Sequence, residues 1–172
     1  MTKTDRRDMA FEYALGRRRE DLFERQAVVD CEWAMHKCQS PIEELFALGL
    51  VSLAGEEEVL KFEHGNEMGG PDYVRTLVFQ QFEILNYRAD FFLQRVCDHE
   101  KSVRQIVVEC DGHDFHDRTK EQARRDKKRD REMQVYCPVL RFTGSEIYAD
   151  HLSCARQALE FLRSTPAVQE AS

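Results

Sequence analysis

Long apolar runs are missing from this sequence. No stretch reaches the ~18 to 20 uninterrupted apolar residues that a membrane-spanning helix requires. The first residues, which include Asp5, Arg6, Arg7 and Asp8, also lack the apolar core of a secretory signal. The sequence therefore predicts a protein without membrane segments, and we expect it in the cytoplasm.

Cysteine patterns that hold metals or disulfide frameworks are also absent. The six cysteines, which contain no Cys-x-x-Cys pair, are Cys31, Cys38, Cys97, Cys110, Cys137 and Cys154. We interpret them as reduced thiols with structural roles. Zinc bound by Cys31 and Cys38 is the alternative, although their six-residue gap is not the usual zinc spacing. No internal repeat or low-complexity segment is present.

Positive charge is scarce overall, since 25 Lys and Arg residues face 32 Asp and Glu residues and the formal net charge is −7. This balance argues mildly against nucleic-acid binding, which is driven by cationic side chains and counterion release. The exception is the segment 118–131, where eight basic and three acidic residues leave a charge of +5. A local basic face therefore survives on an acidic protein.

The chain length limits the number of domains, and the first third of the sequence predicts helices. With 172 residues, 42% of them hydrophobic, it can build one ordinary core and at most one small extra lobe. Residues 4–37 have apolar spacing that predicts one or two amphipathic helices. Ser40 and Pro41 supply an N-cap and a first-turn proline, and the nearly all-apolar segment 42–54 predicts a buried helix.

The remaining two thirds predict a mixed sheet with helices. In order, we expect a loop at 63–72, β-rich sequence at 74–93 broken near Leu85–Asn86, a strand at 103–109, a helix at 119–134, a strand at 138–142 and a helix at 145–162 capped by Ser145. The final strand, helix, strand crossover implies a parallel pair beside antiparallel strands. The predicted fold class is α/β with N-terminal helices. The expected divisions are a helical segment 1–39, a domain 40–163 and a flexible tail 164–172.

The most informative segment is 107–116, where three carboxylates and two imidazoles follow the end of an apolar strand. A buried carboxylate without a partner is costly, and is usually answered by a metal, another cation or a shifted pKa. Glu109 and Asp111 share a strand face. Asp90 lies in an otherwise apolar strand, and antiparallel pairing would bring it to Glu109. Such carboxylates suit a divalent-metal site for phosphodiester cleavage, although pairing of Asp90 with Arg88 or with a helix-borne arginine is the structural alternative.

The order and spacing of several short pieces resemble the PD-(D/E)XK nuclease superfamily, within it the small domains similar to very-short-patch-repair endonucleases. The matching pieces, between about residues 40 and 150, are Ser40-Pro41-Ile42-Glu43, Tyr87-Arg88-Ala89-Asp90, Val108-Glu109-Cys110-Asp111-Gly112, Phe115-His116, Arg125-Asp126 with Arg129-Asp130, and Val139-Leu140-Arg141-Phe142. The resemblance implies a restriction endonuclease-like fold and Mg²⁺-dependent hydrolysis of DNA phosphodiester bonds, with Mn²⁺ as an alternative ion.

The resemblance also implies roles for single residues. Asp90 and Glu109 would bind the metal, with the main-chain carbonyl of Cys110 as a further ligand. Glu43 would approach from the buried helix and orient water or a second ion. Glu44 competes with it for this role, and only the motif match favours Glu43. Pro71–Asp72 is a literal copy of the motif name, but it lies in a glycine-rich loop and is better explained as a turn.

One position departs from the superfamily pattern. The lysine expected two residues after Glu109 is replaced by Asp111, which would assist the metal ligands instead. His116 is the first candidate to replace the lysine, either as a base, because a histidine with a near-neutral pKa can accept a proton from water, or as a phosphate ligand. Lys120 is a second candidate, and His113 is a weaker one.

The basic segment supplies the candidate contacts to a nucleic-acid backbone. These are Lys120, Arg124, Lys127 and Lys128, together with Arg141 from the following strand. Ordinary surface pairs, such as Asp126 with Arg129, are the alternative explanation of the helix charges. Arg141 could hold phosphate or neutralise Asp111. Two other functions stay open: an inactive nuclease-fold protein that binds nucleic acid or a protein partner, and an RNase.

Overall fold

A computed structural model describes residues 3–21, 24–54, 59–62, 74–97, 99–112 and 120–169 of the chain. Its elements, in chain order, are α1 (Lys3–Asp21), α2 (Glu24–Met35), α3 (Pro41–Leu53), β1 (Val59–Phe62), β2 (Val74–Ile84), β3 (Tyr87–Cys97), β4 (Ser102–Asp111), α4 (Lys120–Tyr136), β5 (Val139–Thr143), α5 (Gly144–Ser164) and β6 (Val168–Gln169). The loop predicted at 63–72 lies outside the described residues.

The strands form one mixed sheet in the order β1-β2-β3-β4-β5, and β6 pairs with β4 off this path. Strands β2, β3 and β4 are antiparallel neighbours, whereas β4 and β5 are parallel and joined through α4. The predicted α/β class, with a mixed sheet and flanking helices, is therefore confirmed. The sequence did not predict β1, which pairs in parallel with β2.

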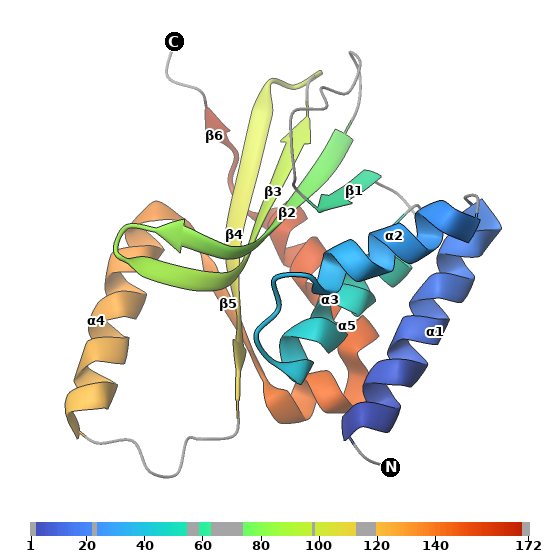
Figure 1. Cartoon of the computed structure of the whole chain (residues 1–172). Coiled ribbons are helices and arrows are strands. Elements are labelled where there is room, and N and C mark those ends of the chain that lie inside the picture. The colour runs from blue at the N-terminus through green and yellow to red at the C-terminus, as the bar shows by residue number, and fades with distance from the viewer. Residues whose placement is uncertain are drawn as a thin grey trace.

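Helices cover both faces of the sheet, with α4 on one side and α1, α2, α3 and α5 on the other (Figure 1). The larger core lies on the side of α3 and α5, where the ring of Phe46 packs 5.0 Å from Phe91 and 5.8 Å from Phe142. A smaller core under α4 includes Met133 and Phe92. The two cores follow from the alternation of side chains along a strand buried on both faces.

Helix α3 is buried nearly all round, as its apolar sequence predicts. It approaches α5 so closely that a Cβ atom on Gly49 would lie 2.7 Å from the main-chain oxygen of His151. The absence of a side chain at position 49 therefore permits the close packing of the two helices. Helices α1 and α2 add small residues such as Ala14 and Ala34 to the same core, so the N-terminal segment covers α3.

The start of α5 differs from the sequence-based expectation. The N-cap of α5 is Thr143 and not Ser145, because the Thr143 hydroxyl accepts from the Glu146 amide while the Glu146 carboxylate accepts from the Thr143 amide. We expected a flexible tail from residue 164, and within this segment Val168 pairs with Val103 of β4. All six cysteines are free, and no helix in the described residues is long and apolar enough to cross a membrane.

The β2–β3 hairpin bends sharply before its tip. Gln81 adopts a left-handed backbone conformation with φ of 50°, between the paired positions Gln80↔Phe91 and Phe82↔Ala89. Beyond this point the hairpin curves toward α4 (Figure 1). The hydroxyl of Tyr87 donates to Glu132 of α4 at 2.6 Å and anchors the tip there. The bend lies opposite Asp90, one of the candidate site residues.

Candidate functional site

The candidate site forms where the antiparallel pairing of β3 and β4 ends. The last paired residues are Phe91 and Val108, so the same register, continued by one residue, sets Asp90 opposite Glu109, and the charge of Asp90 acts on Glu109. The expectation that antiparallel strands bring these two carboxylates together is therefore met. Continued pairing of β4 with β5 holds Glu109 beside Arg141. The site thus rests on three neighbouring strands.

The Asp90 side chain makes a hydrogen bond to β4 at the point where the main-chain hydrogen bonds between β3 and β4 end. Its Oδ2 atom accepts a hydrogen bond from the Cys110 amide at 2.8 Å, in place of a main-chain partner. Burial raises the pKa of Asp90 to about 6 against the lowering effect of this hydrogen bond, and the nearby charge of Glu43 adds to the rise. Arg88, an alternative partner for Asp90, instead donates to the Gln39 side chain at 2.7 Å.

Glu109 is only 4% exposed, and Nη2 of Arg129 donates to its Oε1. Burial raises the pKa of Glu109 to about 7, and the charge of Asp90 contributes, although the Arg129 guanidinium opposes both effects. A nearby cation stabilises the charged form of a buried carboxylate. In the described residues Arg129 supplies that cation.

Asp111 and Arg141 form the outer part of the site. Nη1 of Arg141 lies 3.3 Å from both carboxylate oxygens of Asp111. The register explains the contact, because Arg141 is paired with Glu109 and its side chain therefore emerges on the face that Glu109 and Asp111 share. Of the two roles open for Arg141, neutralisation of Asp111 is the one observed.

Glu43 and Glu44 are separated by the packing of α3. Glu43 is buried and accepts from the Gln39 amide at 2.9 Å, the Ser40 hydroxyl at 2.7 Å and the Gln81 side chain at 2.7 Å. Glu44 instead faces α1 and accepts from Arg7 at 3.5 Å. The structure therefore brings Glu43 near Asp90, but its oxygens already complete the N-cap of α3 and hold the bent β2 strand.

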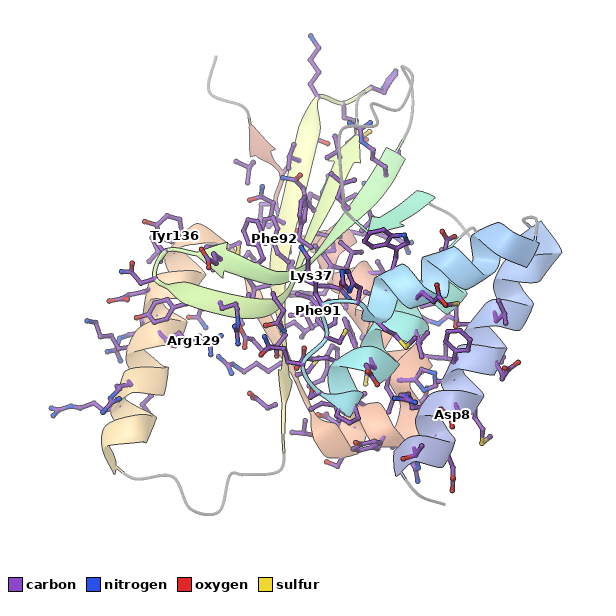
Figure 2. All side chains as sticks on the ribbon, in the orientation of Figure 1. Asp8, Lys37, Phe91, Phe92, Arg129 and Tyr136 are labelled. Carbon is purple, nitrogen blue, oxygen red and sulfur yellow. The ribbon has the colours of Figure 1, made fainter. Side chains whose placement is uncertain are left out.

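Arg129 has a role at the site that sequence reasoning missed, because only its contact with Glu109 places it there. Figure 2 shows it on the side of α4 that faces the sheet, below the hairpin. Its Nη2 also donates to the main-chain oxygen of Arg88 at 3.2 Å, and its guanidinium lies 6.0 Å from the centre of the Tyr87 ring. From the sequence, Asp126 was the expected partner of Arg129, but the side chain of Asp126 is outside the described part of the structure. Only the placement of α4 over β4 identifies Glu109 as a partner.

Several predicted site residues are outside the described part of the chain. His116, the candidate proton acceptor, falls in the segment 113–119, together with His113. Lys120 begins α4, but its side chain is not described. Among the predicted backbone contacts, Arg124, Lys127 and Lys128 are exposed on α4. The alternative turn residue Asp72 is also outside the described residues.

The donor set at the site consists of oxygen atoms, which Mg²⁺ and Mn²⁺ prefer. The available groups are the carboxylates of Asp90 and Glu109 and the main-chain carbonyl of Cys110. In the described conformation no group of three or more His, Cys, Asp or Glu residues is arranged to hold a metal. The oxygen donors of the site thus match a divalent cation in their chemistry, although Arg129 already contacts Glu109.

Comparisons with protein-family models, curated proteins and solved structures find no match to this chain.

The raised pKa of Glu109 predicts how stability changes with pH. Folding favours the neutral form of Glu109. The contribution of this side chain to the free energy of unfolding is therefore complete below the ordinary pKa of 4.5 and is lost as the pH rises through about 7. We expect the free energy of unfolding of the wild type, minus that of Glu109→Gln, to fall by roughly 1 to 3 kcal/mol between about pH 5 and about pH 8. Urea unfolding of both proteins measures this difference, and a constant difference would contradict the prediction.

Proposed function

We propose that this protein is a Mg²⁺-dependent nuclease that hydrolyses DNA phosphodiester bonds, with a restriction endonuclease-like fold. The observation that carries the proposal is the facing pair Asp90 and Glu109 at the end of the β3–β4 ladder. Burial raises the pKa of both carboxylates, and a bound cation would stabilise their charged forms. The ordered motif pieces of the sequence support the same function.

In this proposal Asp90 and Glu109 hold the ion, with the Cys110 carbonyl as a further ligand. The bound ion would supply positive charge that shields the reacting phosphate and helps to orient water. His116 accepts the proton of the attacking water, since an imidazole can do so near neutral pH. Asp111 assists by holding Arg141 at the outer edge of the site.

Glu43 receives a revised role within the proposal. The sequence motif made it a candidate to orient water or a second ion. Its three hydrogen-bond donors leave it better suited to keep the start of α3 and the bend of β2 in place around Asp90. It is therefore proposed as a positioning residue.

The exposed cations of α4 would contact the DNA backbone. Arg124, Lys127 and Lys128 project to solvent from the same helix whose Arg129 reaches Glu109, and Lys128 also pairs with Glu132 at 3.6 Å. Such contacts orient a duplex without reading its sequence. The proposal therefore includes no base specificity.

A side-by-side assay tests the reaction and its substrate. The full chain is incubated with plasmid DNA, an end-labelled oligonucleotide and total RNA, each with Mg²⁺, with Mn²⁺ and with EDTA. We expect metal-dependent cleavage of the DNA substrates. Cleavage of RNA alone would favour the RNase function, and no cleavage of any substrate would contradict the proposed activity.

A second candidate function is favoured by the ion pairs of the site. Arg129 and Arg141 already face Glu109 and Asp111, and the lysine expected after Glu109 is absent. A nuclease-fold protein that has lost catalysis and binds nucleic acid would show these features. Binding of a labelled DNA duplex that is unaffected by Mg²⁺ and not followed by cleavage would support this candidate.

A further inference from the structure

Arg129 connects two parts of the structure that meet at the candidate site. From α4 it donates to the Glu109 carboxylate at the end of β4 and to the Arg88 carbonyl near the start of β3. Its guanidinium also lies over the Tyr87 ring of the same strand. A change in the position of this one side chain would therefore alter both the charge beside Glu109 and the attachment of the hairpin.

The hydrogen bonding of Arg129 is incomplete in this position. Its Nε atom is buried and has no hydrogen-bond partner among the described residues. A buried donor without an acceptor is unfavourable, so the guanidinium would gain from a further oxygen ligand. Phosphate oxygens match this group well, because a guanidinium can donate two parallel, charge-assisted hydrogen bonds to them.

Glu109 is shared between Arg129 and any ion that binds the site. The carboxylate is almost completely buried, and one of its oxygens already accepts from Arg129. A divalent cation on the same carboxylate would lie within a few ångströms of the guanidinium. Two positive charges at that separation repel strongly where water is largely excluded. The two partners of Glu109 therefore oppose each other.

We infer that Arg129 competes with the divalent cation for Glu109 and moves to a DNA phosphate when the cation binds, an inference that rests on the proposed nuclease function. DNA would draw the guanidinium away from Glu109, and the cation would displace it toward DNA. Because such coupling is reciprocal, each ligand strengthens the binding of the other. The protein without DNA would then bind the cation weakly.

Calorimetric titration of the full chain with Mn²⁺, in the absence of DNA, tests the competition. We expect Arg129→Gln to bind Mn²⁺ about tenfold more tightly than the wild type, which corresponds to about 1.4 kcal/mol. Arg125→Gln is the matched control, since it removes the same charge from an exposed position one turn earlier on α4. It should leave the Mn²⁺ affinity unchanged.

The same titration with a short phosphorothioate duplex tests the coupling, because this duplex keeps the backbone charge and resists hydrolysis. DNA should strengthen Mn²⁺ binding by the wild type and by Arg125→Gln, and much less by Arg129→Gln. Arg129→Lys keeps a single positive charge and should give an intermediate Mn²⁺ affinity without DNA. If circular dichroism and thermal unfolding show that Arg129→Gln does not fold, the Arg129→Lys variant still tests the competition.

The outcomes separate this inference from the proposed function. If Mn²⁺ binds and Glu109→Gln abolishes binding, but neither Arg129 variant binds it more tightly than the wild type, competition by Arg129 is wrong and the nuclease site stands. Weaker Mn²⁺ binding by both Arg129 variants than by the wild type would also show that competition by Arg129 is wrong. If no protein binds Mn²⁺ with or without DNA, both the metal site and the competition are wrong.

Discussion

Replacement of Glu109 by Gln should reduce Mg²⁺-dependent DNA cleavage by about 10³-fold, because a bound metal supplies several kcal/mol of transition-state stabilisation. Gln keeps the size of the side chain and removes the charge that attracts the cation. Asp90→Asn should have a similar effect, since the two carboxylates face each other across β3 and β4. Initial rates of oligonucleotide cleavage at saturating Mg²⁺ measure both losses.

A matched control separates this effect from a general loss of acidic charge. Glu83 is an exposed carboxylate on β2, so Glu83→Gln should cleave DNA at the wild-type rate. The far-ultraviolet circular dichroism of all three variants should match that of the wild type. Cleavage by both Glu109→Gln and Asp90→Asn at the wild-type rate would remove these residues from the site and contradict the proposed mechanism.

Replacement of Phe46 by Ala should lower the free energy of unfolding by about 3 to 5 kcal/mol, the usual cost of deleting a buried phenylalanine ring. Phe46 is fully buried, and its ring packs against Phe91 of β3 and Phe142 of β5. The cavity would lie between α3 and the strands that carry the candidate site. Urea unfolding at neutral pH measures the loss.

Phe46→Leu is the control for this prediction, because it keeps most of the apolar volume. Its cost should be clearly smaller than that of the alanine variant. Equal and small losses for both variants, below about 1 kcal/mol, would show that the ring does not fill a tightly packed core at this place. Glu109 lies on the opposite face of β4, toward α4, so the Phe46→Leu variant should retain the Mn²⁺ affinity of the wild type.

Local patterns were sufficient for much of the fold. The buried helix α3 was predicted from its serine cap, Pro41 and continuous apolar sequence, all of which act within a few residues of one another. The parallel pairing of β4 and β5 followed from the strand, helix, strand order, because a crossover of that length favours a parallel pair. The error at the α5 cap was also local, since Thr143 and Glu146 form a capping box that the sequence already contained.

Pairing of the two central carboxylates was also predictable, because it needs only adjacent antiparallel strands and their register. The sequence placed Asp90 and Glu109 on such strands, and the structure sets them opposite each other. The choice between Glu43 and Glu44 was not predictable in this way. Both have apolar neighbours along the helix, and only the packing of α3 between the sheet and α1 directs one inward and the other toward Arg7.

The segment 107–116 supplied the acidic residues of the site, and their burial could be expected from the apolar strand that precedes them. The partners of those residues come from distant parts of the chain. Arg129 reaches Glu109 from α4, and Arg141 reaches Asp111 from β5. Neither pairing has a local signal, because ion pairs between separate elements depend on how helices and strands pack and not on spacing along one of them. Tertiary packing alone thus places the Arg129 guanidinium on Glu109, the strongest candidate metal ligand.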